Sequence, residues 1–258
     1  MNIPLSPVLT IARYTAMEAI RTRYAWLILV LVVTGMAIAA FTGDLAITET
    51  SQTQSAITAS LLRLAAVLLL ILFVTTSVHR DFSDKSVELM LSLPLPRGGY
   101  YLGKLCGYVL VAAGTAAPLC LLLALFTPAE ASVMWGLSLL LELILVCALS
   151  LLFAFAFSQI TASISATLLF YLLGRSIAAI QLMAHGPLVN QGQPSSRLMT
   201  GLVDTLAFLL PSLNEFSRSA WLLYPVSAME LAPVLAQTLV YVTLLSGIAL
   251  FDLYRKNF

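Results

Sequence analysis

Long apolar runs separated by short polar segments make up most of this chain. A helix needs about 20 apolar residues to cross a hydrocarbon core that is ~30 Å thick. Six runs come close to that length: residues 24–41, 57–78, 105–126, 133–157, 162–183 and 231–251. The pattern therefore predicts an all-α polytopic membrane protein with six transmembrane helices, folded as a single transmembrane domain over residues 1–258.

Two further segments have apolar residues without reaching the length of a span. Residues 5–23 place apolar side chains at helical spacing among Arg13, Glu18 and Arg21, which predicts an amphipathic interfacial helix on the membrane surface. Residues 184–230 form the longest loop. Its apolar stretch, Leu198–Leu210, is too short to span and is expected to dip into the membrane or lie on its surface.

Composition and charge set the solvent and the orientation. Of the 258 residues, 60% are hydrophobic and 10% are charged, against roughly 25% charged residues in ordinary soluble domains. The net charge of +1 argues against a nucleic-acid partner. If both termini are cytoplasmic, nine Lys and Arg residues lie inside and two lie outside, which is the bias of the positive-inside rule. The inside set is Arg13, Arg21, Arg23, Arg80, Lys85, Arg97, Lys104, Arg255 and Lys256, and the outside set is Arg197 and Arg218. The predicted location is the bacterial cytoplasmic (inner) membrane, with the 184–230 loop external.

Residues 79–104, HRDFSDKSVELMLSLPLPRGGYYLGK, form a charged cytoplasmic loop between the second and third spans. Residues 83–86 are helix-capping types, an apolar run follows, and Pro94 and Pro96 stop it. The pattern predicts a short helix over Ser86–Leu93 and a turn at Arg97–Gly99. The loop is interpreted either as a solvated connection or as a docking surface for a soluble partner.

The same loop contains a near match to a phosphate-binding motif. Residues 98–104 fit GxxxxGK, but Leu105 stands where Ser or Thr would bind magnesium, and no strand precedes the motif. ATP binding by these residues is not expected. Gly103 and Gly107 instead form GxxxG, which predicts close helix packing.

Three charged residues, Arg63, Glu142 and Arg175, lie within predicted spans, where each costs a few kcal/mol unless it is compensated. A rise of ~1.5 Å per residue places them ~9, ~14 and ~10 Å below the outer surface, in one layer. We expect Glu142 to pair with Arg175 or Arg63, which leaves one positive charge directed toward a cavity. Alternatively, the charges only join helices, or Arg63 snorkels to the surface.

No other group of residues predicts catalysis or metal binding. Cys106, Cys120 and Cys147 form no CxxC pair, and His79 and His185 are expected on opposite membrane faces. HExxH and GxSxG motifs are missing from the sequence. The chain is therefore not expected to be an enzyme or to hold a metal or cofactor.

The order of an amphipathic helix, six spans and a charged loop after the second span resembles a type-2 ABC transporter permease. The loop of that family is a coupling helix with acidic residues, a Leu-rich turn, Leu-Ser-x-Pro, a basic residue and Leu-Gly-Lys. The corresponding positions here are Asp81, Asp84, Glu88, Leu91-Ser92-Leu93-Pro94, Arg97 and Leu102-Gly103-Lys104. Together with IARYTAMEAIRTRYAW near the N-terminus, they are most similar to the multicopper-enzyme and nitrous oxide reductase maturation branch. This chain has Lys85-Ser86 where the family often has Gly-Thr.

The resemblance implies an exporter subunit whose loop docks on a separate ABC ATPase through Asp81, Asp84, Glu88, Leu91, Pro94 and Arg97. ATP and magnesium would bind to that ATPase, expected in two copies. The other implied partners are a second permease copy or close relative, membrane lipid and a periplasmic accessory protein. Two alternatives are a non-ABC membrane carrier or scaffold and, with less support, an intramembrane enzyme.

Overall fold

The protein is an all-helical bundle over the residues that the computed structural model describes, namely 5–45, 50–84, 97–186, 194–217, 221 and 231–255. These residues form eight α-helices and one 3-10 helix, and none of them is in a strand. Six helices are long and apolar enough to cross a membrane, which confirms the predicted number of spans and makes the chain an integral membrane protein. They are α2 (Tyr24–Leu45), α3 (Thr50–Ser83), α5 (Arg97–Leu123), α6 (Ala129–Ala156), α7 (Ile160–Ala184) and α10 (Leu231–Arg255).

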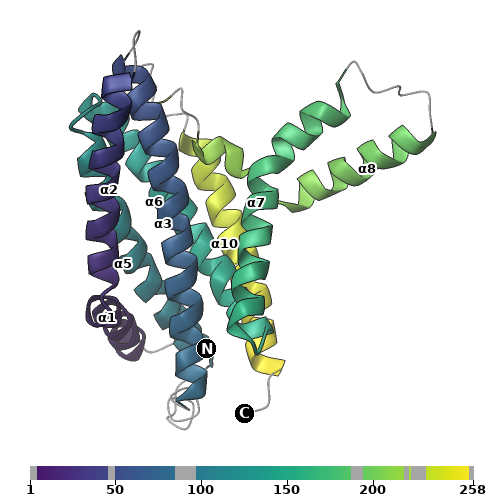
Figure 1. The fold of residues 1–258 in the computed structure, drawn as a ribbon. Coiled ribbons are helices and arrows are strands. Elements are labelled where there is room, and N and C mark those ends of the chain that lie inside the picture. The colour runs from purple at the N-terminus through teal and green to yellow at the C-terminus, as the bar shows by residue number, and fades with distance from the viewer. Residues whose placement is uncertain are drawn as a thin grey trace.

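The six long helices run up and down in chain order, so α1 (Leu5–Arg21) and the last turn of α10 lie at the same end of the bundle (Figure 1). Helix α1 lies across that end instead of along the bundle axis (Figure 1). We call this end of the bundle the α1 end and the opposite one the far end. Helix α3 ends and helix α5 begins at the α1 end (Figure 1).

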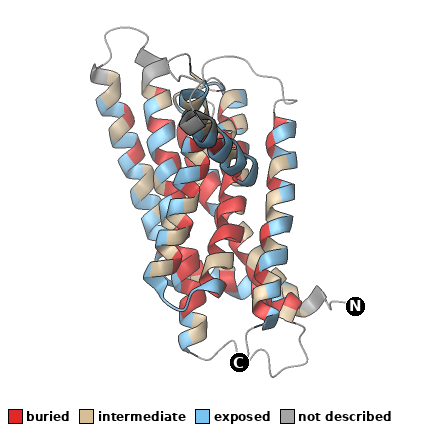
Figure 2. Ribbon diagram, turned by 90° about the vertical axis from the view of Figure 1, so that its right-hand side faces the viewer, coloured by how far each residue is buried: buried red, intermediate tan, exposed pale blue. Residues whose placement is uncertain are grey.

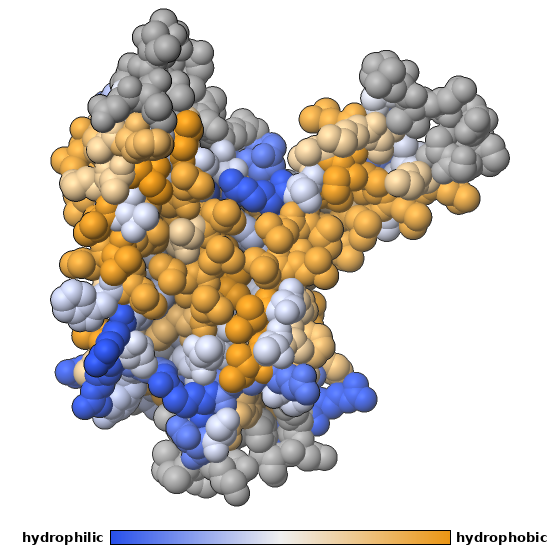
Figure 3. All heavy atoms as spheres, in the orientation of Figure 1, coloured by the Kyte–Doolittle hydropathy of each residue, from blue (hydrophilic) through white to orange (hydrophobic). Residues whose placement is uncertain are grey.

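Helix α6 is the centre of the bundle, because it packs against α3, α5, α7 and α10. Buried residues gather along the middle of the bundle, whereas the outer faces of the surrounding helices are exposed (Figure 2). The exposed faces carry apolar side chains, and hydrophilic surface lies mainly at the α1 end, with a smaller patch where the arm leaves the bundle (Figure 3). This distribution suits a protein surrounded by hydrocarbon, where burial in the centre depends on close packing and internal polar contacts.

Two glycines of α5 allow α1 to pack closely. A Cβ atom at Gly103 would lie 2.8 Å from the Cβ of Ile11, and one at Gly107 would lie 2.6 Å from the Cβ of Thr15. A Cβ at Gly107 would also lie 3.0 Å from the backbone oxygen of Ala12. The predicted GxxxG contact is therefore confirmed, and its partner is α1.

The 79–104 loop is shorter than predicted, because both flanking helices extend into it. Residues 79–83 continue α3, and the Ser83 hydroxyl donates to His79 O at 3.0 Å, so Ser83 lies at the end of a helix and does not cap the start of one. The turn predicted at Arg97–Gly99 is also wrong, since these residues form the first turn of α5. Beyond the hydrocarbon layer a charged helix can continue, since water solvates its side chains. The predicted Ser86–Leu93 helix lies outside the described residues.

The connection between α1 and α2 contains a strained residue. Arg23 has a φ of 63°, in the left-handed region, and it is the only described non-glycine residue with positive φ. Its carbonyl accepts hydrogen bonds from the backbone N–H of Trp26 and Leu27 and so begins α2. A left-handed conformation costs about 1–2 kcal/mol for such a residue, and the contacts of α1 have to offset it.

At the far end, part of the 184–230 loop forms helix α8 (Pro194–Leu209) and the 3-10 helix η1 (Leu213–Ser217). Helix α8 packs against α7, and together with the outer part of α7 it forms an arm that leaves the bundle (Figure 1). The arm has a largely apolar surface (Figure 3). Helix α8 has 16 residues and is too short to cross the bilayer upright, as its sequence predicted.

Replacement of Gly107 by Val should weaken the attachment of α1. The added side chain overlaps Thr15 and the Ala12 carbonyl, and overpacking of this kind costs roughly 1–3 kcal/mol. We expect a lower apparent Tm in detergent and faster proteolysis of α1. Gly114→Val, on the exposed side of the same helix with nothing within 4 Å of its Cβ, should leave both unchanged. Equal Tm values for the two variants would contradict the proposed packing role.

Candidate functional site

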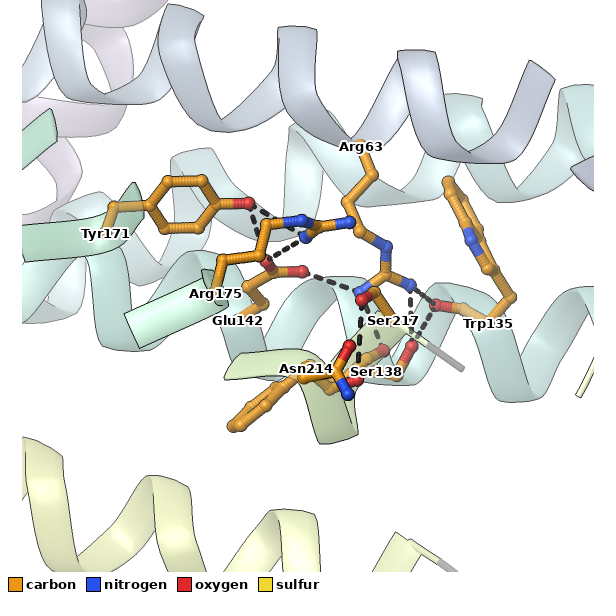
Figure 4. Close-up of polar contacts among 9 residues, drawn as sticks. Arg63, Trp135, Ser138, Glu142, Tyr171, Arg175, Asn214 and Ser217 are labelled. Carbon is orange, nitrogen blue, oxygen red and sulfur yellow. Dashed lines mark hydrogen bonds and ion pairs between the residues drawn. The ribbon is translucent and has the colours of Figure 1, made fainter. Parts of the chain in front are cut away.

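Three charged side chains meet inside the bundle, toward its far end (Figure 4). Arg63 comes from α3, Glu142 from the central α6 and Arg175 from α7. Glu142 accepts from Arg63 Nη1 at 2.6 Å through Oε2, and from Arg175 Nη1 at 3.4 Å through Oε1. One carboxylate therefore holds two guanidinium groups, where sequence reasoning proposed a choice between them.

Arg63 is fully enclosed and bonded on several sides. Its Nη1 also donates to Phe216 O at 2.9 Å, and its Nη2 donates to Ser138 Oγ at 2.8 Å. The guanidinium lies 5.0 Å from the centroid of the Trp135 ring, a cation–π distance. With 1% of its side chain exposed, Arg63 cannot snorkel to the surface, so that alternative is wrong.

Arg175 is held differently from Arg63. Its side chain is 27% exposed, and the contacts of its Nη1 are with Glu142 and with Tyr171 Oη at 3.1 Å. The Tyr171 hydroxyl in turn donates to Glu142 Oε1 at 2.9 Å, so the two α7 side chains share one carboxylate oxygen. Arg175 is thus the arginine of the pair that can meet a solute or water.

The cluster has an excess of one positive charge, because two guanidinium groups share one carboxylate. Glu142 is fully buried, so removal of its charge would leave two arginines facing each other in a medium of low dielectric constant. The cluster therefore joins α3, α6 and α7 electrostatically and leaves the partly exposed Arg175 as its accessible cationic group. It offers no nucleophile and base pair for hydrolysis.

Close packing of α7 brings part of the 184–230 loop to the cluster. A Cβ atom at Gly174 would lie 3.0 Å from Pro211 O and 3.1 Å from a methyl group of Leu213, so only glycine lets η1 approach α7 this closely. Since η1 begins two residues after Pro211, this approach places Phe216 O against Arg63. The loop at the far end is therefore tied to the centre of the bundle.

A second polar network lies at the α1 end. Lys104 is buried, and its Nζ lies 2.6 Å from Asp81 Oδ2 and 3.7 Å from Glu18 Oε2. Glu18 also forms an ion pair with Arg80. The Tyr100 hydroxyl donates to Asp81 Oδ2 at 3.1 Å. These contacts join α1, α3 and α5 on both sides of residues 85–96, and they place Lys104 inside the protein and not at the lipid headgroups.

The residues predicted to contact an ATPase fall into two groups. Asp81, Asp84 and Arg97 are described: Asp81 belongs to the α1-end network, and Asp84 is exposed at the end of α3. Arg97 Nη1 donates to Leu253 O at 2.9 Å and to Tyr254 O at 3.2 Å, which satisfies carbonyls at the end of α10. Glu88, Leu91 and Pro94 lie outside the described residues.

Sequence reasoning did not identify Tyr171, Ser138 or Phe216 O as partners of the buried cluster. Tyr171 could have been found, since it lies four residues before Arg175 and so on the same helical face. The Phe216 carbonyl could not, because a backbone oxygen in a distant loop has no signature in a sequence. At the α1 end, Glu18 was noted only as a polar residue of the interfacial helix.

No three His, Cys, Asp or Glu side chains are grouped as metal ligands among the residues that the structure describes. His79 is bonded to Thr75 O at 3.0 Å and lies 3.4 Å from Ser163 Oγ. His185 pairs with Asp204 on the arm at 3.5 Å. Neither histidine is close to the charged cluster in the bundle.

Comparison with known proteins adds no family to this picture. No protein-family model matches the chain, and no curated protein is similar to it. The resemblance to type-2 ABC permeases therefore stays a prediction that depends on the residues of the 79–104 loop and the N-terminal segment.

Glu142→Gln should destabilise the bundle far more than Arg175→Gln. Glu142→Gln leaves two cations without a counter-charge and should lower the free energy of unfolding by about 3–5 kcal/mol. Arg175→Gln removes a partly exposed group with a long contact and also removes the excess charge. Thermal unfolding in detergent would compare them, and the addition of Arg175→Gln to Glu142→Gln should recover part of the loss. A larger effect of Arg175→Gln than of Glu142→Gln would contradict this ranking.

Proposed function

We propose that this chain is the transmembrane permease subunit of an ATP-driven ABC exporter. It pairs as a dimer, with a second copy or a close relative, and couples to a separate ATPase through residues 79–104. The proposal places both termini and this loop in the cytoplasm, ATP and magnesium on the ATPase, and no catalytic site in this chain. It rests on the residue pattern of the loop and on how the structure holds both ends of that loop.

The observation that carries the proposal is the rigid attachment on both sides of residues 85–96. On the α3 side, Arg80 and Asp81 are bonded to Glu18 and Lys104. On the α5 side, Arg97 is bonded to the end of α10, and Lys104 closes the network with α1. A solvated connecting loop does not require such anchors. A loop that receives force from a partner requires them, because flexible joints at its two ends would absorb the movement before it reached the helices.

Helix α3 supplies a direct mechanical connection from the loop to the buried cluster. It is one continuous helix of 34 residues that carries Asp81 near one end and Arg63 in its first half. The 18 residues between them correspond to about 27 Å along the helix axis. Movement of α3 at the α1 end would therefore act on the Arg63–Glu142 pair, and through Glu142 on α6 and α7. This is a proposed route, for which a coupling measurement is the test.

Glu88→Arg should disconnect the permease from its ATPase. Affinity-tagged chain would be purified from its native membranes, co-purified proteins identified by mass spectrometry, and ATP hydrolysis measured in the eluate. We expect an ABC ATPase with the unmodified chain and a loss of more than about tenfold in the recovered hydrolysis with Glu88→Arg, because charge reversal at an interface costs several kcal/mol. Glu130→Arg is the matched control, since Glu130 is exposed in the first turn of α6, at the far end of the bundle.

Two results would overturn the proposal. One is the absence of any ATPase from the purified complex under conditions in which the bundle stays folded. The other is transport by the chain alone in proteoliposomes without ATP, which would favour the alternative of a non-ABC carrier. If Glu88→Arg and Glu130→Arg recover equal ATP hydrolysis, the coupling role of the loop is contradicted, whereas the proposed ATPase partner is not.

A further inference from the structure

Two pockets adjoin where α1 turns into α2. The larger has a volume of about 680 Å³ and has most of the charged side chains in its lining, and the smaller, of about 320 Å³, is lined mainly by apolar side chains. Both are lined by Thr22 and Arg80, so they adjoin at these two residues, and we call the two together the elbow groove. Its larger part is lined by Tyr14, Glu18, Arg21 and Asp81, and its smaller part by Leu27, Leu69, Leu72 and Phe73.

The polar part of the elbow groove has an excess of positive charge. Its acidic side chains, Glu18 and Asp81, already pair with Arg80 and with Lys104 behind them. Together with Arg21, the cations Arg80 and Lys104 outnumber these two carboxylates by one. The net charge of this group is therefore +1. Arg21 is exposed and has no ion pair or hydrogen-bond partner for its side chain among the described residues. A ligand with one negative charge would neutralise this part of the groove.

The apolar part of the groove runs along the membrane-facing side of the bundle. Leu27 of α2 and Leu72 of α3 are exposed there, with the Phe73 ring between the two helices. The groove therefore begins at charged side chains near α1 and continues along surface that hydrocarbon would cover. This order of charge and apolar surface is the order within a single phospholipid molecule.

We propose that the elbow groove is a specific site for an anionic glycerophospholipid of the leaflet at the α1 end. Its phosphate lies between Arg21 and Arg80, and one acyl chain follows Leu27, Leu69 and Leu72 over Phe73. Basic side chains near the membrane surface attract anionic headgroups. The apolar part makes a lipid bind more tightly than a free anion. The net positive charge makes an anionic lipid bind more tightly than a zwitterionic one.

Such a lipid would contact both sides of the α1–α2 turn. Thr22 lies in both parts of the groove and directly precedes Arg23, the residue in the left-handed conformation. A bound lipid would therefore stabilise α1 across the end of the bundle. The inference does not rest on the transport function, since it needs only a membrane around the six long helices.

Native mass spectrometry of the full chain in detergent can test the site, by titration with dioleoyl phosphatidylglycerol or dioleoyl phosphatidylcholine. We expect tighter binding of phosphatidylglycerol. Arg21→Gln should weaken it by roughly fivefold, toward the level of phosphatidylcholine, because one charge-assisted contact is lost. Arg13→Gln is the matched control, since Arg13 is an exposed arginine of the same helix outside the groove.

A second pair of variants tests the apolar part. Thr76 lines the smaller pocket and is exposed, so Thr76→Trp should block the acyl chain and weaken both lipids. Leu68→Trp, on an exposed position of α3 outside the groove, should weaken neither. Unchanged phosphatidylglycerol binding in Arg21→Gln and Thr76→Trp would show a non-specific lipid annulus and overturn the proposal.

Two other outcomes would also overturn it. If sn-glycerol 3-phosphate binds as tightly as phosphatidylglycerol and Thr76→Trp has no effect, the groove is a site for a free oxyanion. If the two lipids bind equally to the unmodified chain, the site does not select an anionic headgroup.

Discussion

Hydrocarbon offers no water to a buried charge, and Glu142 is where this chain meets that constraint. Its carboxylate lies on the central helix and receives Arg63 from one side and Arg175 with Tyr171 from the other. Because α6 contacts most of the other helices, a carboxylate at this position fixes α3 and α7 relative to the core. The Arg63 contact with Phe216 O extends the same restraint to the 184–230 loop. The geometry of the far half of the bundle depends on this one acidic side chain.

At the α1 end, buried charge is compensated by more ionised side chains, several of which are partly exposed. There Glu18 and Asp81 are balanced by Arg80 and Lys104, and close contacts at Gly103 and Gly107 hold α1 against α5. The two polar layers are connected by α3, which has no break between them. Helix α3 is therefore one continuous connection from its end beside residue 85 to the buried charges. The function that we propose uses this connection.

Hydropathy predicted six spans because long apolar runs have no alternative to lipid, and simple helix-rise arithmetic placed Arg63, Glu142 and Arg175 in one layer. The sequence could not show how each helix is rotated about its axis, so it left open which arginine Glu142 contacts. It also ended α3 too early and began α5 too late, because charged residues that continue these helices were interpreted as loop. The Arg63–Phe216 O bond depends on tertiary packing around Gly174, which no local pattern encodes. The loop residues Glu88, Leu91 and Pro94 stay predictions.

The unequal count of charges at the buried cluster has a consequence for what can pass near it. One uncompensated positive charge repels a divalent cation 10 Å away by about 3 kcal/mol at an effective dielectric constant near 20. That energy lowers the local concentration of such an ion roughly a hundredfold. Neutral and anionic molecules meet no such barrier. The excess positive charge at the level of Arg175 therefore disfavours the approach of metal cations.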